Sequence, residues 1–243
     1  MIERDVKIET AAGHMHAFTV HPESVEPLPP VIFYMDAPGF RDELKDMARR
    51  IARYGYFVVL PDLYYRVGTI RMVLDRANDK TMAIMRAVRN TLTNDMVVTD
   101  TAGILGFLDA QDAVRPGPVG AVGHCMSGSY IVAVAATYPS RITAAAAFYG
   151  TQIITDEADS PHRIADRIKG EIYLSFAEVD TYVPDHIPGG IREVFEKAGV
   201  KHTVEVVPGT HHGYAFPLRP AHHPEAAEAG HQKLMALFER NLK

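Results

Sequence analysis

The chain has 243 residues, of which 47% are hydrophobic and 23% are charged, and its formal net charge is −5. This length and this apolar fraction allow one domain with a large core. The negative net charge and the scattered basic residues argue against a nucleic-acid or anionic-membrane partner, so we expect a small-molecule partner. No apolar run reaches the roughly 18 residues of a membrane span.

A single cysteine is present, which excludes an internal disulfide. The first residues lack the basic start and the apolar core of a signal peptide, so we expect a cytoplasmic location. No feature of the sequence decides the oligomeric state.

The first part of the chain predicts a sheet edge followed by a βαβ unit. Residues 5–10 and 14–21 alternate around Ala-Ala-Gly, which is typical of an antiparallel hairpin. Continuous apolar runs at 30–35 and 56–60 indicate strands buried on both faces. Between them, apolar residues at helical spacing predict a helix over 41–54.

The next stretch predicts an insert above the sheet. The pattern is irregular over residues 63–68 and becomes helical, with many Met and Arg residues, from about 70 to 91. We expect residues 63–92 to cover the active site as a helical and aromatic insert. An amphipathic helix over 95–113 follows.

The remainder of the chain again alternates strands and helices. An apolar strand over 118–122 leads to a helix-like run over 130–136, and further strands and helices follow at 142–149, 172–176, 188–198, 202–207 and the C-terminus. Strands separated by helices indicate βαβ units. We therefore predict one α/β domain over residues 1–243, with a mostly parallel sheet, an N-terminal antiparallel hairpin and helices on both faces.

Residues 123–128, Gly-His-Cys-Met-Ser-Gly, join a predicted strand to a predicted helix. Small residues on both sides of a nucleophile are typical of a tight turn that pushes one side chain into a cleft. The usual turn has glycine two residues after the nucleophile, whereas Ser127 stands there and Gly128 follows. A lone cysteine is more often a small buried apolar residue, but the glycine-rich turn favours Cys125 as a catalytic thiol.

Asp36, Cys125, Asp180 and His212 all follow predicted strands. In parallel sheets the loops at the carboxyl ends of the strands form the site, so we expect these residues to converge. A helix N-terminus and an imidazole favour the thiolate form of cysteine, and His212 is the candidate base. Asp180 would hold the tautomer of that histidine. The chain order nucleophile, acid, histidine is the one expected of an α/β-hydrolase.

Alternatives to the acid and the base lie close by. Asp185 is the rival carboxylate, although Asp180 lies closer to the strand end. His211 competes with His212, and the choice between them rests mainly on the resemblance given below. The pairs 211–212 and 222–223 also raise a metal site, but adjacent histidines in a strand point to opposite sides and no helical His-Glu-x-x-His occurs. We expect neither a metal nor a cofactor.

Further groups would bind the substrate around the thiol. The backbone N–H groups of Met126 and Ala37 are the candidate oxyanion hole, because Pro38 has no N–H to donate. Arg66 lies in the aromatic insert and Arg219 follows the histidine loop. Arginines are usually solvated, but over a cleft these two would grip a substrate carboxylate.

At this point the sequence resembles the dienelactone hydrolase family, a branch of the α/β-hydrolases with a cysteine nucleophile. The matching segments cover nearly the whole chain in order, at residues 61–66 (Pro-Asp-Leu-Tyr-Tyr-Arg), 123–128, 180–184 (Asp-Thr-Tyr-Val-Pro) and 212–216 (His-Gly-Tyr-Ala-Phe). The resemblance implies Cys125, Asp180 and His212 as a catalytic triad that cleaves an ester or lactone through an acyl-thioester. It also implies Arg66 as a carboxylate-binding residue and Tyr65 as a pocket-lining residue.

The sequence departs from the best-known members of this family at two places. Those members carry a glutamate that contacts the resting thiol, whereas this chain has Asp36, one methylene shorter. They also place a second substrate-binding arginine soon after the catalytic histidine, and Arg219 stands seven residues after His212. These departures bear on the substrate more than on the reaction.

The leading hypothesis is a cofactor-independent hydrolase of small esters or lactones that resembles carboxymethylenebutenolidase. One alternative is an acyltransferase, or a hydrolase of another carbonyl compound, with the same triad. The other is a non-catalytic ligand-binding or thiol-sensing protein on this scaffold, because a fold does not determine a function.

Overall fold

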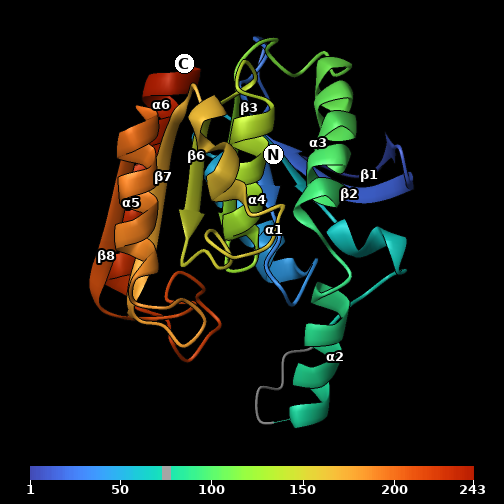
Figure 1. Cartoon of the computed structure of the whole chain (residues 1–243). Coiled ribbons are helices and arrows are strands. Elements are labelled where there is room, and N and C mark those ends of the chain that lie inside the picture. The colour runs from blue at the N-terminus through green and yellow to red at the C-terminus, as the bar shows by residue number, and fades with distance from the viewer. Residues whose placement is uncertain (73–77) are drawn as a thin grey trace. The chain divides into compact units, whose positions relative to one another are not determined.

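Strands and helices alternate along the chain, whose computed structural model describes residues 1–72 and 78–243 (Figure 1). They form two units, residues 1–116 and 117–243, each with its own strands and packed helices. The expectation of a single domain with an insert over the active site stays a prediction. Among the described residues, no helix is long and apolar enough to cross a membrane.

In the first unit, β1 (Ile2–Thr10) and β2 (Gly13–His21) form the predicted antiparallel hairpin. β2 also pairs antiparallel with β4 (Phe57–Pro61), and β4 pairs parallel with β3 (Pro30–Tyr34). Every residue of β3 and β4 is buried, since a strand covered on both faces carries apolar side chains in both directions. The two continuous apolar runs therefore predicted these strands correctly.

Two helices of the first unit pack on its strands. α1 (Asp42–Ala52) buries one apolar stripe, as its helical spacing predicts. α3 (Asn94–Asp109) lies against β1 at Gly103, where an added Cβ would be 2.4 Å from the carbonyl oxygen of Glu9, so the close approach requires glycine. The sequence predicts that this helix ends at residue 113, but it ends at Asp109.

The predicted insert is only partly helical. Leu63–Arg66 forms a short 3-10 helix (η1), and α2 spans Asp79–Arg89. The expected helix over 70–91 is wrong at its start, because residues 70–72 are not helical and Asn78 begins α2 by accepting the backbone N–H groups of the next turn. Residues 73–77 of that prediction lie outside the described residues. No side chain of α2, all of which is described, is buried.

The second unit contains four strands in parallel pairing. They run in the order β5 (Val119–His124), β6 (Ile142–Phe148), β7 (Glu171–Val179) and β8 (Lys201–His211), and β6, β7 and β8 are labelled in Figure 1. This arrangement confirms the predicted parallel βαβ units. It also brings the carboxyl ends of these strands to one edge of the sheet.

Helices cover both faces of the strands in this unit. An added Cβ at Gly120 would lie 2.9 Å from Phe238 in α6 (Pro224–Leu242), and one at Gly123 would lie 2.6 Å from Ser127 in α4 (Ser127–Thr137). Residues an odd number apart on a strand point to opposite faces, so α4 and α6 lie on opposite sides.

The helix that precedes β8 ends as its sequence predicts. α5 (Ile187–Ala198) is followed by Gly199, which has φ +68° and donates its backbone N–H to the carbonyl of Glu196 at 3.2 Å. Glycine reaches this left-handed conformation without the steric cost that a side chain adds.

A further 3-10 helix, Pro161–Arg167 (η2), lies in the stretch that leads to β7, and nothing in the sequence pattern indicated it.

Candidate active site

Cys125 lies in a strained turn between β5 and α4. Its φ is +55°, in a backbone region that residues other than Gly, Asn and Asp rarely adopt. The turn is held by its backbone, because the N–H of Cys125 donates to the carbonyl of Phe148 at 3.1 Å and its carbonyl accepts from Gly128 at 3.0 Å. Such strain concentrates at functional sites, and Cys125 is partly exposed.

Small residues around this turn allow a second loop to approach it. An added Cβ at Gly128 would lie 2.3 Å from the Cα of Gly150. The same loop binds the turn directly, since the backbone N–H of Thr151 donates to the carbonyl of Cys125 at 2.9 Å. Gly128 is therefore required for packing between the loop after β6 and the start of α4, even though the usual glycine position holds Ser127.

Asp180 and His212 meet at the ends of β7 and β8. The Nδ1 atom of His212 lies 2.7 Å from Oδ2 of Asp180, and both side chains are nearly inaccessible to solvent. The other carboxylate oxygen of Asp180 accepts the backbone N–H of Tyr182 at 2.9 Å. The carboxylate is thus fixed by its own loop, with one oxygen left for the imidazole.

The surroundings of His212 favour its protonated form. Burial lowers the pKa of the imidazole, but its hydrogen bonds and electrostatic interactions with Asp180 and Cys125 outweigh burial and raise the pKa to about 9. Nδ1 is bound to Asp180, so the buried Nε2 atom is the one left to interact with the Cys125 side chain. Nε2 is therefore the nitrogen left to exchange a proton with a reacting group.

Two tyrosines that the sequence interpretation did not single out lie against the imidazole. The ring centroid of Tyr149 is 5.0 Å from that of His212 in an edge-to-face arrangement, and that of Tyr182 is 4.7 Å away. Tyr149 also has a positive φ of +41°. Its position directly after β6 was the available signal, because this is a further strand end at the same edge of the sheet.

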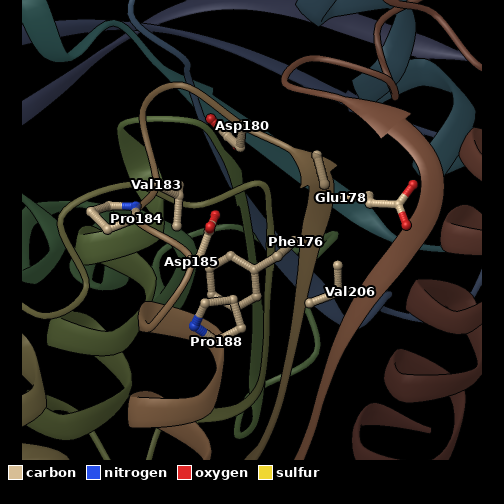
Figure 2. A pocket seen from close by; sticks show the side chains of 9 residues that line it. Phe176, Glu178, Asp180, Val183, Pro184, Asp185, Pro188 and Val206 are labelled. Atoms are coloured by element: carbon tan, nitrogen blue, oxygen red, sulfur yellow. The ribbon is translucent and has the colours of Figure 1, made fainter.

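A pocket of about 180 Å³ lies beside Asp180, lined by the end of β7, the loop that follows it and the start of α5. Figure 2 shows Asp180 and the rival carboxylate Asp185 on this loop. Both carboxylates line the pocket, and Asp180 also binds His212. The rival histidine, His211, is exposed and pairs with Val179 across the strands.

Asp36 and Ala37 lie after β3 in the first unit. Asp36 is fully buried and forms an ion pair with Arg41, which also binds Glu43 at 2.7 Å. Arg41 was missed at the sequence level because a basic residue just before a helix usually faces solvent. The carbonyl of Ala37 accepts the hydroxyl of Tyr64 at 2.7 Å.

Tyr65 and Arg66 share one buried carboxylate, that of Asp100 on α3. Arg66 binds it through both terminal nitrogens, and the hydroxyl of Tyr65 donates to it at 2.7 Å. Burial raises the pKa of Tyr65 to about 12, so the phenol stays protonated. The predicted carboxylate-binding arginine therefore has a carboxylate partner within its own unit.

Arg219 lies in the second unit, beside the loop that carries His212. Its side chain is buried, and its guanidinium carbon lies 4.3 Å from the ring centroid of Phe216. An added Cβ at Gly213 would come within 3.1 Å of the arginine side chain. Arg219 thus packs directly against the residue that follows His212.

The second histidine pair has structural contacts. The Nδ1 atom of His222 lies 3.0 Å from the carbonyl oxygen of Tyr214, and His223 caps α6 by accepting the backbone N–H of Ala226. Across the described part of the chain, no group of three or more His, Cys, Asp or Glu side chains has an arrangement that could hold a metal ion.

The fold of the whole chain is that of solved α/β-hydrolases. A crystal structure from Klebsiella pneumoniae, provisionally named dienelactone hydrolase, matches with a TM-score of 0.87 and 23% identity over 98% of both chains. A dienelactone hydrolase-like promiscuous phosphotriesterase from metagenomic libraries matches with a TM-score of 0.81 and 21% identity over 100% of this chain and 99% of the other. The predicted α/β-hydrolase fold, with its mostly parallel sheet and antiparallel hairpin, is confirmed.

The family follows from a comparison of sequences. The model of the dienelactone hydrolase family matches residues 15–242. A protein of Synechocystis sp., provisionally named carboxymethylenebutenolidase, is 27% identical over 93% of this chain and 92% of its own length. One of the same name from Methylorubrum extorquens is 24% identical over 99% of this chain and 81% of its own length. The chain belongs to the dienelactone hydrolase family and is a hydrolase of that family.

Proposed function

We propose that the protein hydrolyses small esters or lactones with Cys125 as nucleophile, His212 as general acid and base, and Asp180 as the group that orients His212. The observation that carries this proposal is the buried hydrogen bond between Asp180 and His212 in the unit that also holds the strained turn of Cys125. A nucleophile, a base and a third group that orients the base are the parts that covalent acyl transfer needs.

The first half of the reaction forms an acyl-enzyme. Nε2 of His212 holds the proton of the Cys125 thiol, and Sγ adds to the substrate carbonyl carbon while the carbonyl electron pair moves to oxygen. The backbone N–H of Met126, at the start of α4, is the proposed donor to that oxyanion. The carbon–oxygen bond then breaks, and the leaving alkoxide takes the proton from His212. In a lactone this alcohol stays attached to the acyl group.

The second half regenerates the enzyme. Water gives one proton to Nε2 of His212 and adds to the thioester carbon, and the carbon–sulfur bond breaks as the carboxylic acid forms. The raised pKa of His212 supports these steps, because the protonated imidazole is the species that each half-reaction creates. Asp180, through its hydrogen bond with Nδ1, stabilises that imidazolium in both halves.

The substrate assignment rests on similarity to relatives. Proteins provisionally named carboxymethylenebutenolidase match over most of this chain, so a dienelactone-like substrate with a carboxylate is the proposed class. Arg219, packed beside the His212 loop, is the proposed carboxylate ligand in the second unit. The roles of Asp36, Ala37, Tyr65 and Arg66 in substrate or oxyanion binding stay predictions.

The proposal is tested with a p-nitrophenyl ester and a dienelactone. We expect iodoacetamide and Cys125→Ala each to abolish turnover, with losses in kcat of up to about 10⁶-fold, the size seen when a triad nucleophile is removed. Undiminished turnover by Cys125→Ala would contradict the proposal.

Neighbouring residues provide matched controls for the other two positions. His212→Ala and Asp180→Asn should lose most of the rate, whereas the exposed neighbour His211→Ala and the rival carboxylate Asp185→Asn should keep it. If His211→Ala lost as much activity as His212→Ala, the assignment of the base would be wrong. If Asp185→Asn lost as much activity as Asp180→Asn, the assignment of the acid would be wrong. A panel of alcohol and amine acceptors, compared with water, distinguishes hydrolysis from acyl transfer.

A further inference from the structure

Tyr214 and Ser175 form a hydrogen bond in the core of the second unit. Their hydroxyl oxygens are 2.5 Å apart, and neither side chain is accessible to solvent. Ser175 lies on β7, the strand that leads to Asp180, and Tyr214 stands two residues after His212. The bond therefore joins the segment that carries the acid to the segment that carries the base.

Pairing between β7 and β8 becomes irregular just before the catalytic residues. The register shifts between Ala177 and Val179, and Val179 opposite His211 is the last pair. His212 follows this last pair directly, so the regular backbone ladder stops short of it. Contacts outside the ladder, among them the Ser175–Tyr214 hydrogen bond, therefore hold the chain on the far side of His212.

The loop is held at Tyr214 by its backbone as well. The carbonyl of Tyr214 accepts the backbone N–H of His223 at 3.0 Å, and its own N–H donates to the carbonyl of His211 at 3.0 Å. Its ring lies 5.2 Å from that of Tyr149, which itself packs edge-to-face on His212. Burial raises the pKa of Tyr214 to about 12, so the phenol remains neutral at neutral pH.

We propose that the Ser175–Tyr214 hydrogen bond positions the imidazole of His212 against Asp180. Tyr214 is thus a positioning residue, because it acts through the loop of His212 and touches no reacting atom. The inference rests on the proposed function, in which His212 is the catalytic base. A small displacement of a catalytic group costs a large factor in rate, since the reacting atoms must lie within a narrow range of geometry.

Tyr214→Phe removes the hydroxyl and keeps the ring. We expect kcat to fall by about 10-fold or more with KM changed less than about twofold, since the lost contact orients the base and binds no substrate. Ser175→Ala should have the same effect. The double variant should be no worse than either single variant, because the two changes remove one shared interaction.

Tyr34→Phe is the matched control. The hydroxyl of Tyr34 lies 2.8 Å from that of Thr101, and both side chains are fully buried in the first unit. This control should lose a similar amount of thermal stability while its kcat stays within about twofold of the wild type. An equal loss of kcat in Tyr34→Phe would attribute the effect to general destabilisation and overturn the proposal.

The pKa of His212, measured by NMR of its imidazole, tests the position of the ring against Asp180 independently of the reaction rate. If the bond positions the imidazole, Tyr214→Phe and Ser175→Ala should lower this pKa by about half a unit or more, because a displaced ring loses part of its hydrogen bond with Asp180. The pKa measurement needs no turnover. An unchanged pKa together with an unchanged kcat would overturn the positioning role, whereas full activity of Cys125→Ala would overturn the proposed function alone.

Discussion

Gly128→Ala tests whether close packing supports the turn that presents Cys125. The added Cβ would lie 2.3 Å from the Cα of Gly150 and 2.9 Å from the backbone nitrogen of Thr151. Both neighbours are backbone atoms, so no side chain can rotate away. Reaching the roughly 3.5 Å of an ordinary carbon–carbon contact requires the loop after β6 to move by about 1 Å.

The cost of this substitution combines three contributions. Overpacking of this kind costs about 1–3 kcal/mol, and a weakened hydrogen bond from Thr151 to the carbonyl of Cys125 adds about 1 kcal/mol. The better helix propensity of alanine returns about 1 kcal/mol. We expect a net loss near 2 kcal/mol, which for a chain of this length lowers Tm by about 4–8 °C.

Thermal unfolding and ester turnover measured on the same preparations provide the assay. Gly189→Ala in α5 is the control, because an added Cβ there meets no atom within 4 Å. This control should gain up to about 1 kcal/mol from helix propensity. We also expect kcat of Gly128→Ala to fall at temperatures where the variant is fully folded. The displaced loop carries Thr151, whose backbone N–H binds the carbonyl of Cys125. Wild-type Tm and kcat in Gly128→Ala would refute the packing argument.

Two further predictions concern the dependence of stability on pH. The pKa of His212 is raised from 6.5 to about 9, so its stabilising contribution is complete below pH 6.5 and is lost as the pH rises through about 9. Urea unfolding of the wild type should show this loss, and Asp180→Asn should reduce it; parallel curves for the two proteins would contradict the assignment. Hydrogen bonds with Arg240 lower the pKa of Glu171 to about 2, so its contribution is present above about pH 4.5 and is lost as the pH falls through about 2. Glu171→Gln should therefore be less stable than the wild type at pH 7 with the difference closing near pH 2, whereas the exposed Glu193→Gln should change little at either pH.

Much of the fold is determined by local patterns in the sequence. The continuous apolar runs of β3 and β4 are predictable because a strand buried on both faces has no polar side to show. The end of α5 at Gly199 is predictable because glycine alone adopts its conformation without strain. The start of α2 was not predictable in this way. The apolar and basic residues from 70 onward are compatible with a helix that begins at residue 70, whereas α2 begins after its N-cap, Asn78.

The tertiary structure decided between neighbouring candidates, and it supplied partners that the sequence pattern did not indicate. Asp180 and Asp185 are a few residues apart in the sequence and line the same pocket, and the folded loop brings the Asp180 carboxylate to His212. Likewise the pairing of Arg66 with Asp100 joins η1 to α3 across a long stretch of chain. Local periodicity reports which side of an element is buried, but it carries no information on which distant side chain completes an ion pair or a hydrogen bond. That choice depends on the register and packing of whole elements, which the sequence of each element alone does not contain.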